Sequence, residues 1–101
     1  MGKKAAIPSH LSAESRRIWR EIESEWDLDA HSRTILTVAL EAFDEMRLAR
    51  DLVAKYGQVL KSQSGFARVN PAVTALKVAR AQFLHAWKML NLGVEPPGGG
   101  E

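Results

Sequence analysis

The fold is decided by residues 30–56, which read AHSRTILTVALEAFDEMRLARDLVAKY. Apolar side chains recur here at the spacing of an α-helix, which indicates one helix roughly 40 Å long at ~1.5 Å per residue. Asp29 before it is a typical N-cap, and Gly57 after it is a typical C-terminal cap. The apolar positions cover about 200° of the helix circumference, which is wider than one core-facing stripe. We therefore expect a central helix that packs against more than one neighbour.

Two shorter helices flank this central helix. Ser12 is a typical N-cap and precedes a helical repeat of apolar residues, which predicts a helix at about 13–25. Asn70 is followed by a proline in the first helical position, which predicts a helix at about 71–90. Residues 58–69 read as two short extended runs around a Ser-Gly turn. The predicted fold is all-α, with three helices and a short β-hairpin-like connection between the second and the third.

Length and composition predict one domain in a reducing compartment. The chain has 101 residues and no cysteine, which excludes disulfide scaffolds and thiolate metal sites. No apolar run approaches the roughly 18 residues that a membrane-spanning helix needs, so we expect no membrane partner. We expect a single helical domain at 12–93, between a flexible basic arm at 1–11 and a flexible tail at 94–101.

Charge is unevenly distributed although the net charge is only +2. Residues 1–20 are basic and residues 21–51 are acidic, whereas residues 52–94 contain six basic residues and no acidic one. Such a distribution favours contact between the basic parts and a polyanion. It also favours contact between the acidic and basic faces of neighbouring copies.

No arrangement of residues indicates catalysis. Asp27, Asp29 and His31 resemble a metal-binding trio only in composition, because capping and solvation explain them. The carboxylates within residues 41–45 lie on the polar arc of the central helix, which we interpret as a solvated face. Without a nucleophile–base pair or a metal cluster, we expect a non-enzymatic protein with no cofactor and no metal site.

Several short motifs occur in a characteristic order along the chain. They are IPSHLS at 7–12, SRRIWREI at 15–22, NPAV at 70–73 and LNLG at 90–93. The ordered set, which spans about residues 7–97, resembles the P27 family of phage terminase small subunits. None of the motifs is specific alone.

The resemblance implies a function in viral genome packaging. Small terminase subunits form homo-oligomeric rings, bind double-stranded viral DNA and hand it to the large terminase subunit in the cytoplasm of the host cell. The large subunit owns the ATPase and the nuclease. This division agrees with the absence of a catalytic arrangement in the sequence.

The uneven charge supplies candidates for DNA contact. We expect no separate N-terminal DNA-binding domain within this chain, and we expect phosphates to meet the basic arm, the first helix and the acid-free second half. The candidates are Lys3, Lys4, Arg16, Arg17, Arg20, Lys61, Arg68, Lys77, Arg80 and Lys88. A helix-turn-helix led by residues 30–34 is an alternative, but the acidic arc of the same helix disfavours it. Trp19 and Trp87 fit core positions better than base-stacking positions. For Trp26, which lies in the turn, the sequence does not decide between the two.

Self-association has its own signals in the sequence. Val78 and Leu84 lie outside the apolar stripe of the third helix, so they lack a partner in a three-helix monomer. Leu40 and Phe43 lie on the wide apolar arc of the central helix. We expect these four residues to contact neighbouring subunits in a ring. The alternative function is a helical protein–protein adaptor that does not bind DNA directly, and a sequence-specific dimeric repressor is a third alternative.

Overall fold

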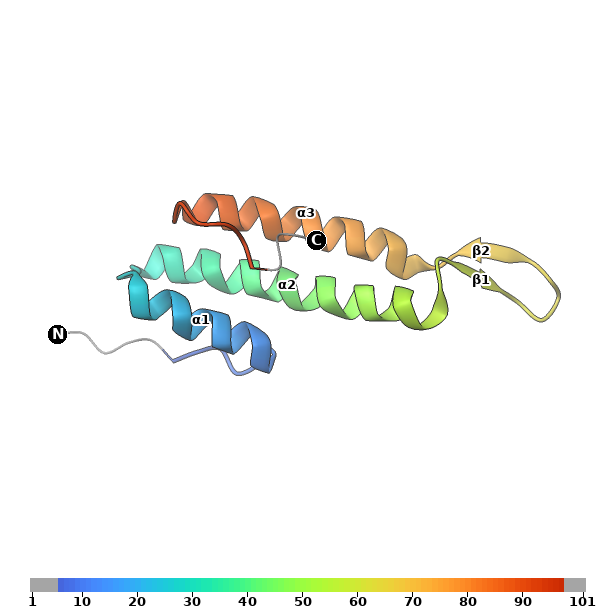
Figure 1. Ribbon diagram of the computed structural model, residues 1–101, viewed down its shortest axis with the longest axis horizontal. Helices are drawn as coiled ribbons and strands as arrows, with labels where there is room; N and C mark the ends of the chain where they lie inside the picture. The colour runs from blue at the N-terminus through green and yellow to red at the C-terminus, as the bar shows by residue number, and fades with distance from the viewer. Residues whose placement is uncertain (1–5, 98–101) are drawn as a thin grey trace.

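The computed structural model describes residues 6–97 and is elongated, with extents of 64 × 25 × 20 Å (Figure 1). The described elements are α1 (Ala13–Glu25), α2 (Ala30–Tyr56), β1 (Val59–Lys61), β2 (Ala67–Val69) and α3 (Pro71–Leu90). The expected helical fold, with a hairpin-like connection between the second and third helices, is therefore confirmed. The helix bounds also coincide with the expected ranges.

The helices α2 and α3 run antiparallel and lie side by side, and we call them the helical pair (Figure 1). Helix α1 lies against the N-terminal half of α2, and β1 and β2 extend from the opposite end. The proximal half of the pair comprises residues 30–46 and 80–90, on the side of α1. The distal half comprises residues 47–56 and 71–79, on the side of the strands.

Local capping explains where the helices begin and end. The side chains of Ser12, Asp29 and Asn70 each accept a hydrogen bond from a backbone N–H in the first turn of the following helix. Helix α2 ends at Gly57, whose φ of 82° favours glycine, and α3 ends at the left-handed Asn91. These caps depend on neighbouring residues only, which is why the sequence predicts the bounds well.

The large core side chains lie in the proximal half. Leu36 is almost completely buried there, and Trp19 of α1 is almost completely buried in the same core cluster. Phe83 lies between Phe43 and Trp87, with ring centroids 5.4 Å and 5.9 Å away. Burial of Trp19 and Trp87 confirms their predicted core positions, and Trp26 is partly buried against the same cluster.

Asp44 attaches the start of α1 to α2. Its carboxylate accepts hydrogen bonds from the backbone N–H of Ser12 at 2.9 Å, from the Ser12 hydroxyl at 2.6 Å and from the Ser15 hydroxyl at 2.6 Å. One turn earlier on α2, Glu41 lies 2.7 Å from His10 Nε2. The interpretation of these acids as a solvated face was thus wrong for Asp44, which holds the start of α1, whereas the side chain of Glu41 remains 43% exposed.

The packed part of the chain extends further at both ends than we expected. Leu11 is 4% exposed and Ile7 packs against the core, so the predicted arm at 1–11 is too long. Lys3 and Lys4 lie outside the described residues. At the other end, the carbonyl of Val94 accepts a hydrogen bond from the Trp87 indole at 3.0 Å, so the predicted tail begins too early.

Candidate functional site

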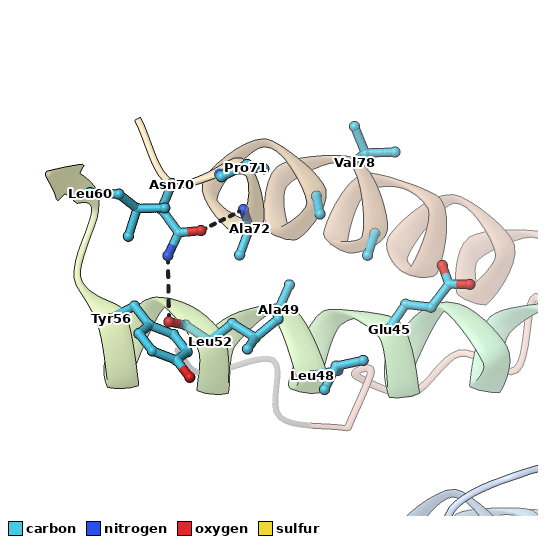
Figure 2. Close-up of a pocket in the computed structure, with 12 residues that line it drawn as sticks. Glu45, Leu48, Ala49, Leu52, Tyr56, Leu60, Asn70, Pro71, Ala72 and Val78 are labelled. Carbon is cyan, nitrogen blue, oxygen red and sulfur yellow. Dashed lines mark hydrogen bonds between the residues drawn. The ribbon is translucent and has the colours of Figure 1, made fainter. Parts of the chain in front are cut away.

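A groove with a volume of about 680 Å³ separates α2 from α3 in the distal half (Figure 2). We call it the distal groove. Its lining residues are Glu45, Leu48, Ala49, Leu52, Tyr56, Leu60, Asn70, Pro71, Ala72, Ala75, Val78 and Ala79. None of these described lining residues carries a positive charge, and Glu45 is the one acid among them. The groove is therefore an apolar surface with a single negative charge.

The distal groove exists because the side chains that α2 and α3 bury here are too small to fill the space between the two helices. The buried residues here are alanines (Ala49, Ala72 and Ala79), while Leu48 is 63% exposed. Asn70 closes the end of the groove: its amide donates to the Gly57 carbonyl at 2.8 Å and to the Leu52 carbonyl at 3.5 Å, and Figure 2 shows the second of these bonds. The helices are thus held in place without large side chains filling the space between them.

A second hollow, of about 410 Å³, continues this apolar surface into the proximal half. It is lined in part by Ile35, Val38 and Met89, and Glu45 lines both hollows. No residue of α1 lines either hollow, so α1 covers a different side of the helical pair. The pair consequently presents one face that the described part of the chain leaves uncovered.

The four residues expected at a subunit interface separate into two groups. Leu40 and Phe43 are 0% and 5% exposed and belong to the subunit's own core, so their assignment to an interface was wrong. Val78 and Leu84 are exposed, and Val78 lines the distal groove. Leu84 lies about 120° further around α3 at ~100° per residue, so it belongs to a different side of that helix.

The basic residues of α1 differ in their availability. Arg17 forms an ion pair with Glu14 and another with Glu21. In the second pair, Arg17 Nη1 lies 2.8 Å from Glu21 Oε2. The Arg17 hydrogen bond holds the pKa of Glu14 below its ordinary value. Arg16 is half-buried, whereas Arg20 is exposed. Of these three residues, Arg20 offers the most accessible charge.

Six exposed basic residues follow in residues 52–94, and within residues 6–97 none of them forms a salt bridge. Lys55 lies over the Tyr56 ring, 5.3 Å from its centroid, and the other five are the candidates. Lys77 and Lys88 lie eleven residues apart on one flank of α3, with Arg80 about 60° away at ~100° per residue. Lys61 and Arg68 line a hollow of about 450 Å³ on the strands. The structure thus brings the candidates together in separate groups along the long axis rather than at one point.

In the alternative helix-turn-helix, the one arginine at the start of the second helix, Arg33, is bound within the subunit and is not free to contact DNA. The guanidinium of Arg33 donates to the Leu28 carbonyl at 2.7 Å and is half-buried in the turn between α1 and α2. Its side chain stabilises this turn rather than facing outward from the start of α2.

Within residues 6–97, no three potential ligands form a metal-binding group, and no helix is long and apolar enough to cross a membrane.

The family model described as "Phage terminase, small subunit" matches residues 12–94. The chain belongs to the phage terminase small subunits. The match extends from the N-cap of α1 to beyond the end of α3, so it includes every helix and strand described above. No curated protein and no solved structure matches the chain. Membership in the family gives this small subunit a role in phage DNA packaging.

Two surfaces of this small terminase subunit therefore have the chemistry of an interface. The distal groove and the hollow beside it are apolar and suit a protein partner. The exposed basic residues of the strands and α3 suit a polyanion. Sequence reasoning named the basic residues, whose contact with DNA stays a prediction, but it missed the groove because the groove depends on how α2 and α3 pack together.

Proposed function

We propose that this subunit binds double-stranded viral DNA as a homo-oligomeric ring and presents it to the large terminase subunit in the host cell cytoplasm. It acts without catalysis of its own, because in this division of labour the large subunit supplies the ATPase and the nuclease. The narrower assignment to the P27 family belongs to the same proposal. The observation that carries DNA binding is the acid-free stretch of residues 52–94, in which the candidate cations of the strands and α3 are exposed and form no salt bridge within the described residues.

Phosphate contact needs accessible cations that no neighbouring acid neutralises. Lys61, Arg68, Lys77, Arg80 and Lys88 meet both conditions within the described residues. A cation that contacts a phosphate releases a condensed counterion, so affinity falls as the salt concentration rises. Repetition of the same cations around a ring adds contacts on one DNA molecule and raises the total affinity.

Ring formation is supported by two exposed apolar positions on different sides of α3. A closed ring needs head-to-tail contacts, in which two different surfaces of each subunit meet. Val78 lies in the distal groove, and Leu84 lies on another side of the same helix. Each subunit then offers one surface to the copy before it and the other surface to the copy after it.

DNA binding is tested with the full chain and a fluorescently labelled duplex. We expect anisotropy to rise with protein at about 50 mM salt and the affinity to fall steeply towards about 200 mM salt. The triple variant Lys77→Gln, Arg80→Gln, Lys88→Gln should bind more weakly and with a shallower salt dependence. Absence of binding at low salt would contradict the proposal and favour the adaptor that does not contact DNA.

A further inference from the structure

The strands β1 and β2 and the turn between them form a two-stranded ribbon, residues 59–69, that extends beyond the ends of the helices (Figure 1). The strands pair antiparallel, with Leu60 opposite Arg68 and Lys61 opposite Ala67. Gly65, with a φ of 91°, makes the tight turn possible. Every residue of the ribbon except Leu60 is exposed. An isolated ribbon of this kind is marginally stable in water, so a binding partner would order it further.

The chemistry of the ribbon is that of a nucleic-acid contact. Leu60, Lys61, Ser62, Phe66 and Arg68 surround a hollow of about 450 Å³. Two cations therefore lie beside an aromatic ring that is 78% exposed. Cations bind phosphates, and aromatic side chains stack on bases or insert between base steps. The ribbon itself carries no acid that would repel a phosphate.

The ribbon differs from the distal groove in charge and in shape, and these differences favour DNA as the partner of the ribbon and a protein as the partner of the groove. No lysine or arginine is among the described residues that line the groove, and its charged residue is the acid Glu45. The ribbon has the opposite charge, and it protrudes where the groove is concave. A two-stranded antiparallel ribbon also has the dimensions that the major groove of B-DNA, about 12 Å wide, admits.

We propose that the ribbon is the element that enters a groove of duplex DNA. Lys61 and Arg68 contact phosphates, and Phe66 contacts the bases or sugars between them. This inference rests on the proposed DNA-binding function and names the element that performs it. The basic flank of α3 then adds further phosphate contacts along the same duplex.

The test compares ribbon variants of the full chain in the anisotropy titration. The double variant Lys61→Gln, Arg68→Gln should lose about tenfold or more in affinity. The slope of log K against log salt should become shallower by about 2, since each phosphate contact contributes about 0.9. Phe66→Ala should weaken binding with the slope unchanged, because the ring carries no charge. The control Arg47→Gln removes an exposed arginine of α2 that lies outside the acid-free stretch, and it should leave affinity and slope as in the wild type.

The outcomes separate this inference from the function on which it rests. If the wild type binds and the double variant has its affinity and slope, the ribbon is not the DNA contact, while DNA binding by the subunit stands. If the wild type does not bind, both proposals fail. If Phe66→Ala lowers the oligomeric mass in light scattering and leaves the affinity of the remaining oligomer unchanged, the ribbon is a subunit contact and the inference is overturned.

Discussion

In the proximal half of the helical pair, Leu36, Phe43 and Phe83 are buried, and α1 lies against α2 (Figure 1). In the distal half, alanines occupy the buried positions, while Leu48 is 63% and Val78 is 50% exposed. The same two helices therefore bury large side chains at one end and small ones at the other, where the larger of the two open hollows lies. If the proposed ring forms through the distal groove, folding and association would use different ends of one helical pair.

The two halves of the helical pair should contribute differently to the free energy of unfolding. Burial of large apolar side chains stabilises the proximal half within one subunit, at roughly 25 cal/mol per Å² of apolar surface removed from water. Exposed apolar side chains of the distal half contribute little until another surface covers them. Substitutions in the proximal half should consequently change the free energy of unfolding, and substitutions in the distal half should change the oligomeric mass.

The largest effect on stability should come from Phe83→Ala. Phe83 is 2% exposed and packs between Phe43 and Trp87, so its removal leaves a cavity that costs about 3–5 kcal/mol. Leu48→Ala, in the exposed distal half, should cost less than about 1 kcal/mol. Urea unfolding followed by circular dichroism measures both variants. Equal destabilisation by the two would show that the halves do not differ as described.

Asp44→Ala should destabilise the fold by about 2 kcal/mol. It removes three hydrogen bonds to Ser12 and Ser15. The buried Ser15 hydroxyl then keeps only its longer hydrogen bond to the Leu40 carbonyl, at 3.3 Å. Asp51→Ala, a substitution of an exposed acid on the same helix, is the matched control and should remain within about 0.5 kcal/mol of the wild type. The comparison breaks down if the control is as damaging as Asp44→Ala in the same urea titration.

Val78→Asp should lower the oligomeric mass while changing the unfolding of a subunit little. The new carboxylate would be desolvated in a subunit contact at the distal groove, whereas in a free subunit it would stay hydrated. Thr74→Asp places the same charge at an exposed position of α3 that does not line the groove, and it should keep the wild-type mass. Light scattering distinguishes them, and an unchanged mass for Val78→Asp would exclude the groove as a subunit contact.

The smallest effect should be a change in acid sensitivity on Asp29→Asn. The Ser32 backbone N–H, 2.8 Å away, lowers the pKa of Asp29 from its ordinary 3.8. Its folded-state pKa lies below the unfolded one, so the stabilisation is full above the unfolded pKa and is lost as the pH falls through the folded one. Asparagine also caps helices but does not titrate here. Thermal melts between about pH 5 and pH 2 should therefore show a smaller loss of stability for the variant.

The sequence was sufficient for the features that depend on nearby residues. Ser12, Asp29 and Asn70 cap their helices through contacts with residues two or three positions away, so the bounds could be predicted. The ribbon could also be predicted, because its turn residues are adjacent. The basic residues of α3 could be placed on one flank from helical periodicity alone.

Features that depend on the packing of distant segments could not be predicted in the same way. The wide apolar arc of α2 did not show which part faces α3 of the same chain, so Leu40 and Phe43 were assigned to the wrong surface. Asp44 bonds residues about thirty positions earlier, a contact that no local pattern contains. The distal groove needs the relative rotation of α2 and α3, which the periodicity of each helix leaves undetermined.

We propose that the proximal half stabilises the subunit and that the distal half contacts other subunits. The most direct test of this division is the mass of the wild-type chain in solution. Size-exclusion chromatography with light scattering, at tens of micromolar protein, measures it. A mass of many subunits, lowered by Val78→Asp and preserved by Thr74→Asp, is the predicted result. A wild-type chain that stays monomeric at this concentration would contradict the account, because the open apolar groove would then have no second copy to cover it.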